Sequence, residues 1–245
     1  MQRPRIYTPG PLRAGATLIL PESAAAHVLR VLRLAAGDAI TLFDGSGSDF
    51  DAVLTLVSRS QVAADVGPGR PVHAESPFAI TLLQGVSRGP RMDTVVQKAT
   101  ELGVRAVQPV LASRSVVRLD AERGGSRLAH WQRIAISACE QCGRAVLPEV
   151  LPARSLPEAL AALSPGTVGL TLDPRATDSL RDLVSGREAV ALAVGPEGGF
   201  TTDEIRILTD AGFRGLRLGP RILRTETAPL AALAILQFAA GDLGP

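Results

Sequence analysis

The spacing of hydrophobic residues changes near residue 70, from short strand-like runs to apolar runs that alternate with helical patterns. In the first part, residues 22–32 have a helical pattern that places His27, Arg30 and Arg33 on one face. Strands are expected at residues 17–20, 39–43, 50–57 and 61–66. The run Asp-Gly-Ser-Gly-Ser between two of these strands is typical of a hairpin turn. Residues 1–70 are therefore predicted to form a small β-barrel or β-rich domain.

Residues 67–71, Gly-Pro-Gly-Arg-Pro, are expected to end regular structure and to mark a domain boundary. Beyond them, residues 74–245 predict about six alternations of strand and helix, which is typical of an α/β domain with a mainly parallel sheet. Strands are expected at residues 79–86, 104–110, 146–150, 168–172, 189–194 and 216–218. Helices are expected at residues 92–102, 126–142 and 230–238, and after the capping boxes Ser155/Glu158 and Thr201/Glu204.

The composition supports a packed core but does not by itself identify a partner. Hydrophobic residues make up 46% of the 245 residues and aromatic residues only 3%, so we expect a core of Leu, Val, Ile and Ala. The formal net charge is +2, which excludes a strong overall attraction to polyanions. Lys98 is the only lysine, and the planar fork of the many arginines suits phosphate. Nucleic-acid binding therefore stays open.

The cysteine pattern and the absence of long apolar runs favour a cytosolic protein. Cys139 and Cys142 have no second Cys/His cluster with which to complete a zinc site, so we expect no metal and reduced thiols. They lie near a predicted helix C-terminus, where the helix dipole does not favour a thiolate, so we expect packing rather than redox chemistry. No run approaches ~18 apolar residues, so no membrane span is expected.

Three predicted strand ends carry unusual loops. They are Leu-Asp-Pro-Arg at residues 172–175, Gly-Pro-Glu-Gly-Gly at residues 195–199, and a longer loop at residues 218–227. In open parallel sheets, ligands bind beyond the carboxyl ends of the strands, and glycine lets the backbone approach a ligand closely. The alternative is a set of tight structural turns with Glu197 in solvent. The spacing of these residues alone leaves both interpretations open.

Other nucleotide-binding and catalytic motifs are absent or weak. No G-x-G-x-x-G follows a predicted strand, and the chain has no Walker A sequence. Residues 85–89 fit G-x-S-x-G, which would make Ser87 the nucleophile of a hydrolase, with Asp120 and His130 following in a suitable order. His130, however, lies within a helical pattern, so the hydrolase remains a minor alternative.

Six sequence blocks in a fixed order resemble a known family. They are Pro-Arg-Ile-Tyr at 4–7, His-Val-Leu-Arg-Val-Leu-Arg at 27–33, Gln-Lys-Ala-Thr-Glu-Leu-Gly at 97–103, Ala-Cys-Glu-Gln-Cys-Gly-Arg at 138–144, residues 195–199, and Leu-Gly-Pro-Arg-Ile-Leu-Arg-Thr-Glu-Thr-Ala at 218–228. Nearly end to end, the chain resembles the bacterial 16S ribosomal RNA uracil-N3 methyltransferases of the SPOUT superfamily. The alternatives are a SPOUT enzyme with another RNA target and a non-catalytic RNA-binding protein.

This resemblance implies a fold and an activity that spacing does not show. The second domain is expected to be a parallel sheet with a C-terminal trefoil knot, although knots are very rare in proteins. The first is expected to be a PUA-like RNA-binding barrel. The resemblance implies a cytoplasmic homodimer with its active site at the subunit interface. It also implies that S-adenosylmethionine is the cofactor and that N3 of a uridine in 16S rRNA of the small ribosomal subunit, near the decoding region, is methylated.

Candidate site residues follow from the loops and the resemblance together. The expected cofactor-binding residues are Leu172, Asp173, Pro174, Gly195, Pro196, Glu197, Gly198, Gly199, Leu218, Gly219, Ile222, Leu223, Arg224, Thr227 and Ala228. The expected catalytic residues are Arg88, Arg91, Arg224 and Glu226. The expected RNA-binding residues are Arg3, Arg5, Arg13, Arg30, Arg33 and Arg88. Glu226 and Glu197 are both candidate proton acceptors, and a structural role in closing the loop is equally open for Glu226.

Overall fold

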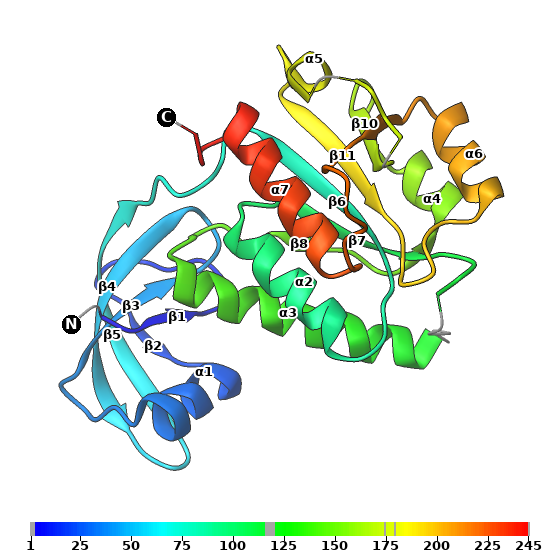
Figure 1. Ribbon diagram of the computed structural model, residues 1–245. Coiled ribbons are helices and arrows are strands. Elements are labelled where there is room, and N and C mark those ends of the chain that lie inside the picture. The colour runs from blue at the N-terminus through cyan, green and yellow to red at the C-terminus, as the bar shows by residue number, and fades with distance from the viewer. Residues whose placement is uncertain (1–2, 116–120, 174, 179, 245) are drawn as a thin grey trace. The chain divides into compact units, whose positions relative to one another are not determined.

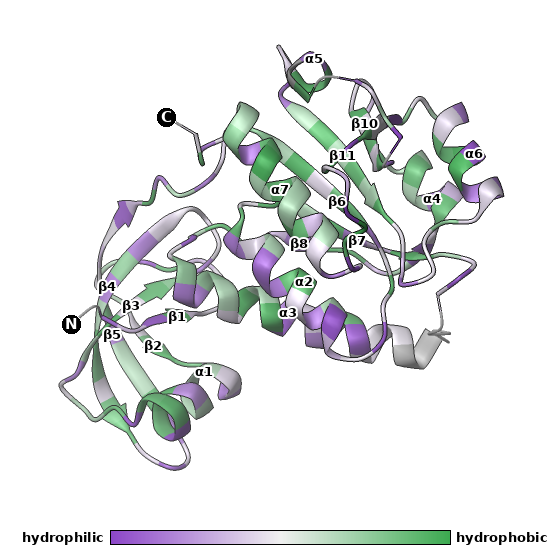
Figure 2. Ribbon diagram, viewed as in Figure 1, coloured by the Kyte–Doolittle hydropathy of each residue, from purple (hydrophilic) through white to green (hydrophobic). Residues whose placement is uncertain are grey.

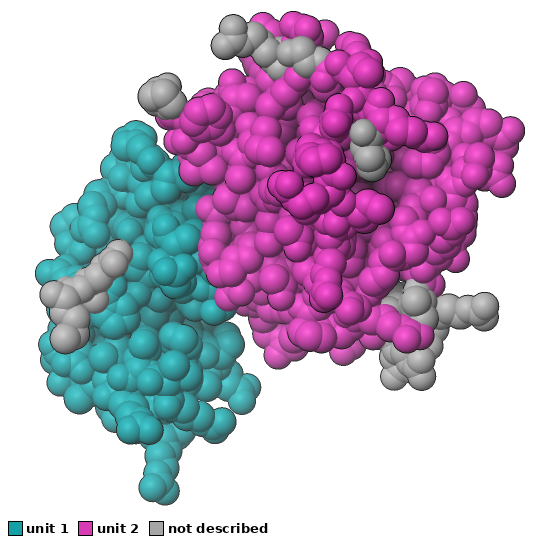
Figure 3. Space-filling model, in the orientation of Figure 1, with its two compact units in different colours: residues 1–75, 136–147 teal, residues 76–135, 148–245 magenta. Residues whose placement is uncertain are grey.

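The computed structural model describes residues 3–115, 121–173, 175–178 and 180–244. The chain divides into two compact units, which Figure 3 colours separately. The first contains Met1–Glu75 and Ile136–Leu147, and the second contains Ser76–Ala135 and Pro148–Pro245. Residues from the middle of the chain thus belong with the first unit, which a boundary near residue 70 does not anticipate.

The first unit contains a five-stranded mixed sheet. Its strands are, in spatial order, β1 (Arg5–Tyr7), β3 (Ala39–Phe43), β4 (Ser48–Val57), β5 (Val62–Pro71) and β2 (Thr17–Ile19). β1 pairs with β3 in parallel, and the other neighbours are antiparallel. Buried aliphatic side chains such as Ile6, Val28 and Leu54 form its core. Among the residues that the structure describes, β1 and β2 are the two edge strands and do not pair with each other. The sheet is therefore open and does not close into a barrel.

Strand β5 continues through residues 67–71, so the prediction that this run ends regular structure is wrong. The two glycines serve close approach to β4: a Cβ on Gly67 would lie 2.9 Å from the Asp51 carbonyl oxygen, and one on Gly69 would lie 2.7 Å from the Phe50 ring. Pro68 lies where the register shifts at a bulge, so its missing N–H costs no regular ladder bond.

The helix predicted at residues 22–32 is in fact two elements. An α-helix, α1 (Glu22–Ala26), passes directly into a π-helix, η1 (His27–Leu32). Arg33 then ends the helix in the left-handed region, with φ 54°. Because a π-helix is wider than an α-helix and Arg33 lies beyond it, the prediction that His27, Arg30 and Arg33 share one helical face is wrong.

The second unit is an α/β structure with a parallel sheet, as predicted (Figure 1). The strands lie in the order β12 (Arg214–Leu216), β10 (Val168–Leu172), β11 (Ala189–Val194), β6 (Ala79–Gly85), β7 (Ala106–Leu111) and β8 (Glu149–Val150), and β9 (Arg154–Ser155) also pairs with β7. Every recorded pairing in this sheet is parallel. The carboxyl ends of its strands therefore face one edge, where the predicted loops lie.

Helices cover both faces of this sheet. Helices α2 (Pro90–Glu101), α3 (Ala121–Cys142, up to residue 135), α5 (Leu180–Val184) and α7 (Thr227–Ala240) pack in one apolar cluster, and α4 (Leu156–Ala161) and α6 (Thr202–Asp210) pack in another. Apolar residues fill the strands between them (Figure 2). Both predicted capping boxes are confirmed, at the starts of α4 and α6. The result is a three-layer unit with its loops at the carboxyl edge.

Candidate functional site

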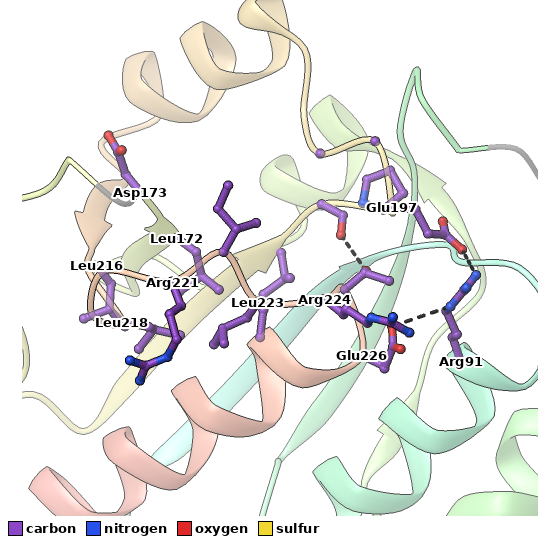
Figure 4. A pocket seen from close by; sticks show the side chains of 18 of the residues that line it. Arg91, Leu172, Asp173, Glu197, Leu216, Leu218, Arg221, Leu223, Arg224 and Glu226 are labelled. Carbon is purple, nitrogen blue, oxygen red and sulfur yellow. Dashed lines mark hydrogen bonds and ion pairs between the residues drawn. The ribbon is translucent and has the colours of Figure 1, made fainter.

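A cavity of about 710 Å³ lies at the carboxyl ends of β10, β11 and β12. Its walls come from the loop after β10, the 195–199 loop after β11, and the 217–226 segment between β12 and α7 (Figure 4). Leu172, Val194, Leu216, Leu218 and Leu223 give it a largely apolar interior. The three loops picked out in the sequence therefore meet at one site of a size typical for small-molecule pockets.

Most of the predicted cofactor-binding residues line this cavity. They are Leu172, Asp173, Gly195, Pro196, Glu197, Gly198, Gly199, Leu218, Gly219, Ile222, Leu223, Arg224 and Ala228. Thr227 begins α7 and is not among the lining residues, and Pro174 lies outside the described residues. Four lining residues were not predicted, namely Val194, Leu216, Arg221 and Thr225. Val194 is the last residue of β11 and Leu216 is the last residue of β12. Their place directly before the candidate loops is the sequence feature that could have identified them as lining residues.

The 195–199 loop is held in place at several points. The Gly199 N–H donates to the Pro196 carbonyl at 2.8 Å, and an Arg114 guanidinium N–H donates to the Gly198 carbonyl at 2.8 Å. A Cβ on Gly195 would lie 2.8 Å from the backbone nitrogen of Phe200. On the other side, a Cβ on Gly85 of β6 would clash with the Pro196 nitrogen. Glycine is required at these two positions because backbone approaches backbone.

Glu197 braces this loop through its carboxylate. Its Oε1 accepts hydrogen bonds from the Arg88 backbone N–H at 3.0 Å and from the Arg91 guanidinium at 2.9 Å. Burial acts to raise the pKa of Glu197, but the hydrogen bonds from Arg88 and Arg91 outweigh it, so its pKa lies below the ordinary value. Glu197 is therefore a charged tether between the loop and the start of α2.

Glu226 occupies a different environment at the N-cap of α7. Its Oε2 is buried and lies 3.6 Å from Arg91 Nε, and it has no hydrogen-bond partner among the described residues. The carboxylate makes no side-chain cap hydrogen bond to α7, so it does not close the loop by capping the helix. Figure 4 shows Arg91 directed toward both glutamates. One guanidinium thus joins two carboxylates at this side of the cavity.

Of the other two arginines predicted to be catalytic, one lines the cavity and one does not. Arg224 is exposed and lines the cavity. Arg88 is exposed and is not among the lining residues, and only its backbone N–H contacts the loop, through Glu197. The structure therefore brings Arg91, Arg224 and Glu226 together at the cavity and leaves the Arg88 side chain outside it.

The arginines predicted to bind RNA in the first unit fall into two groups. Arg5 is buried, and its guanidinium donates to Asp49 at 2.7 Å and to the Cys139 carbonyl at 2.6 Å. The Arg5 guanidinium is engaged inside the unit, and the RNA contact expected of it stays a prediction. The exposed ones are Arg3, Arg13, Arg30 and Arg33, of which Arg3 pairs with Asp51 at 3.1 Å.

The structure also contradicts the hydrolase interpretation of residues 85–89. Ser87 is only 1% exposed, and its hydroxyl lies 3.3 Å from the Gly85 carbonyl and 3.2 Å from Thr225 Oγ1. His130, the proposed base, has its Nε2 3.0 Å from Asp93 instead. Asp120 lies outside the described residues. A buried serine without a neighbouring imidazole is not an activated nucleophile.

Cys139 and Cys142 are not joined by a disulfide. A hydrogen bond with Cys142 and burial raise the pKa of the Cys139 thiol, which keeps it protonated. Its Sγ faces the Val146 carbonyl at 3.8 Å. This environment agrees with packing rather than reactivity. Within the described part of the chain, no group of three His, Cys, Asp or Glu side chains is placed to hold a metal ion, and no helix is long and apolar enough to cross a membrane.

Comparisons with known proteins identify the family. A family model described as an RNA methyltransferase domain matches residues 74–237, and one described as an RNA methyltransferase PUA domain matches residues 20–66. Ribosomal RNA small subunit methyltransferase E of Buchnera aphidicola subsp. Schizaphis graminum is 32% identical over 98% of both chains. This chain belongs to the ribosomal RNA small subunit methyltransferase E family. The resemblance inferred from the sequence blocks is confirmed.

Solved structures of relatives agree with this membership. A putative methyltransferase from Legionella pneumophila, solved with S-adenosylmethionine bound, is 40% identical, has a TM-score of 0.95, and covers 99% of this chain and 100% of its own. A ribosomal RNA small subunit methyltransferase E from Neisseria gonorrhoeae, also bound to S-adenosylmethionine, is 45% identical with a TM-score of 0.94, over 98% of this chain and 99% of its own.

Proposed function

We propose that this protein transfers a methyl group from S-adenosylmethionine to N3 of one uridine in the 16S rRNA of the small ribosomal subunit, near the decoding region. The observation that carries the proposal is the cavity at the carboxyl ends of β10–β12, in a chain 45% identical to a methyltransferase solved with that cofactor. Membership of an rRNA methyltransferase family supports the reaction class. The choice of N3 and of the decoding region rests on the resemblance.

The residues around the cavity fit S-adenosylmethionine. Its flat adenine suits the leucine-lined interior, and its polar groups suit the backbone of the 195–199 loop. Ile222 is 93% exposed at the cavity, an apolar side chain that a bound ligand would cover. When bound, S-adenosylmethionine supplies an electrophilic methyl group on a sulfonium centre. The protein's own task is to hold the cofactor, to align it with the uracil base and to remove the N3 proton.

Methylation at N3 of uracil requires that the base be unpaired and that the N3 proton leave. We assign proton acceptance to Glu226. Its Oε2 has no hydrogen-bond partner among the described residues, whereas Glu197 Oε1 already accepts two hydrogen bonds and has a lowered pKa. A carboxylate held by two donors is a weaker base. Glu197 is assigned the bracing role.

We assign the arginines to interactions with negatively charged groups. Arg91 lies between the two carboxylates and would keep Glu226 beside the reacting base. Arg224, exposed at the cavity, would stabilise negative charge on the uracil oxygens as the proton leaves. Arg88, Arg3, Arg13, Arg30 and Arg33 are exposed and would contact RNA phosphates.

We also propose the two domain architectures implied by the family. Residues 74–245 would contain a trefoil knot: after the edge strand β12, the chain returns across the carboxyl ends of β10 and β11 to bring Thr225 against Gly195. Residues 1–70 would be a PUA-like RNA-binding barrel, supported by the PUA-domain match over residues 20–66 and by the five-stranded sheet.

A homodimer is proposed from the surface of α7, with the active site at the subunit interface. This helix is apolar on nearly all sides, a pattern that belongs to buried helices (Figure 2). Ile235 and Phe238 on it are nevertheless 40% and 63% exposed. A second copy covering this face would bury them. Since the proposed substrate is ribosomal RNA, the protein would work in the cytoplasm.

Two experiments test this function. Calorimetric titration with S-adenosylmethionine should show binding that S-adenosylhomocysteine competes away, and no binding would contradict the cofactor assignment. Nucleoside mass spectrometry of 16S rRNA from a strain lacking the gene should show loss of 3-methyluridine. Loss of a different methylated nucleoside would instead identify another RNA target.

A further inference from the structure

Thr225 lies where three segments of the second unit meet. It is buried, precedes Glu226, and faces both the end of β6 and the 195–199 loop. Its side chain hydroxyl donates to the Gly195 carbonyl at 2.9 Å. Ser87 Oγ lies 3.2 Å from the same hydroxyl, and Gln84 Nε2 donates to it at 3.3 Å. One hydroxyl therefore joins residues that are far apart in the sequence.

The proton and both lone pairs of this hydroxyl face polar partners. A threonine hydroxyl has one proton to donate and two lone pairs that accept. The proton goes to Gly195, one lone pair accepts from Gln84 Nε2, and the other faces Ser87 Oγ, whose single proton is directed either to this hydroxyl or to the Gly85 carbonyl. Without it, the fully buried Gln84 amide would lose one of its two acceptors, the other being the Gly85 carbonyl at 3.1 Å. Leaving buried donors unpaired is costly, so the arrangement favours one geometry.

The same junction explains the G-x-S-x-G run that resembled a nucleophile elbow. Gly85 is required because any side chain there would meet Pro196 of the 195–199 loop. Ser87 is buried, and its Oγ lies within hydrogen-bond distance of Thr225 Oγ1 and of the Gly85 carbonyl. Both positions thus serve the contact between the end of β6 and the two loops of the cavity.

We propose that Thr225 is a positioning residue, whose hydroxyl locks the 195–199 loop to the 217–226 segment and so fixes both walls of the cofactor cavity. Its neighbours Arg224 and Glu226 are held at the cavity by the same contact. The effect on S-adenosylmethionine rests on the proposed function. The restraint on the two walls does not, because it exists without a ligand.

The test compares two substitutions of Thr225 in the full-length protein. Thr225→Val keeps the shape and removes the hydroxyl, and Thr225→Ser keeps the hydroxyl. By calorimetry, Thr225→Val should weaken S-adenosylmethionine binding by about tenfold or more, as expected for a lost buried hydrogen bond with unpaired partners. Thr225→Ser should stay within about threefold of the wild type. Amide hydrogen exchange without ligand should accelerate at residues 195–199 in Thr225→Val alone.

Thr171→Val is the matched control. Thr171 is also buried, and its hydroxyl donates to the Ala193 carbonyl at 3.4 Å in the same sheet, but it does not line the cavity. We expect Thr171→Val to leave both cofactor affinity and exchange at residues 195–199 unchanged. If it weakens binding as much as Thr225→Val does, the positioning role is overturned, because any buried hydroxyl in this sheet would then matter equally.

Other outcomes are equally decisive. A folded Thr225→Val protein with wild-type affinity and wild-type exchange contradicts the proposal. If the wild type itself does not bind S-adenosylmethionine, the proposed function fails, and the exchange experiment alone then decides on Thr225. If Thr225→Val does not fold, Ser87→Ala replaces it, since it removes one partner and leaves the bond to Gly195. Ser87→Ala should weaken binding by about threefold, and unchanged binding and exchange would overturn the proposal.

Discussion

The two walls of the cavity are built in different ways. The 195–199 loop is held by its own turn, by Arg114 and by the Glu197 carboxylate, and Gly195 has no room for a side chain. The 217–226 segment is tied mainly at its end, through Thr225 and Glu226, and Ile222 within it is almost fully exposed. We therefore expect the 195–199 loop to be the rigid wall and the 217–226 segment, which is fixed at Thr225 but exposed at Ile222, to be the more adaptable wall.

Removing the Glu226 carboxylate from the adaptable wall should have the largest effect on methyl transfer. Glu226→Gln is expected to lower kcat by about 10²–10⁴-fold, the usual contribution of a general base, with S-adenosylmethionine affinity within about threefold of the wild type. The rate is measured by methyl transfer to small-subunit RNA under single-turnover conditions, and S-adenosylmethionine affinity is measured by calorimetry. Glu197→Gln is the matched comparison, and a kcat loss as large as that of Glu226→Gln would reverse the assignment of base and brace.

Replacing a glycine by alanine in each wall should show which wall can accommodate an added methyl group without losing cofactor affinity. Gly195→Ala places a Cβ 2.8 Å from the Phe200 nitrogen and 2.9 Å from the Gly199 carbonyl carbon, and this backbone cannot move without changing the cavity. We expect cofactor affinity to fall about 100-fold, within the 1–3 kcal/mol typical of overpacking.

Gly219→Ala is the partner experiment on the adaptable wall. Gly219 has φ 85° and nothing within 4 Å of an added Cβ, so only backbone strain of about 1–2 kcal/mol opposes the change. An effect on calorimetric affinity below about tenfold is expected, because this wall can relax. Equal losses in the two variants would show that the walls do not differ in rigidity.

The Glu197 tether should make part of the stability depend on pH. Hydrogen bonds from Arg88 and Arg91 outweigh the effect of burial and lower the pKa of Glu197 in the folded protein. A carboxyl with a lowered folded pKa stabilises the fold above its unfolded pKa of about 4.3, and that contribution is lost as pH falls through the folded pKa. Urea unfolding of wild type and Glu197→Gln should therefore differ by about 1 kcal/mol at neutral pH and converge in acid. A difference independent of pH would contradict the tether.

The smallest effect is expected at the exposed end of the adaptable wall. Ile222→Ser should leave the melting temperature unchanged, because a surface substitution alters stability by less than about 0.5 kcal/mol. It should weaken S-adenosylmethionine binding by about fivefold, as expected for losing roughly 1 kcal/mol of apolar contact. Ile205→Ser on α6, exposed but outside the cavity, is the control. Equal affinities for Ile222→Ser and wild type would remove Ile222 from the cofactor site.

Local patterns predicted those elements whose causes are local. Strands β3, β10 and β11 have the predicted bounds, since each is an apolar run of strand length. The capping boxes at Ser155 and Thr201 were recognisable because their residues are three apart. The glycine-rich loops pointed to the cavity for the same reason: their composition and their place after strands are readable within a few residues.

Features that depend on distant residues could not be predicted. β5 continues through Pro68 because its register with β4 shifts there, and Pro71 is the last residue of the strand. Arg5 is buried because Asp49 and the Cys139 carbonyl, 44 and 134 residues away, receive its hydrogen bonds. Thr225 was missed because its partner Gln84 lies 141 residues earlier in the chain. Sequence spacing shows which residues are chemically able to act, and tertiary contacts decide which of them do.

The most direct test of the assigned activity is the identity of the methylated nucleoside. Small ribosomal subunits lacking the modification are incubated with the protein and methyl-labelled S-adenosylmethionine, and their 16S rRNA is digested and analysed by mass spectrometry. We predict label in 3-methyluridine with the wild type, and its near absence with Glu226→Gln. Label in a 2′-O-methylated or carbon-methylated nucleoside, or no incorporation by the wild type, would contradict the proposed reaction.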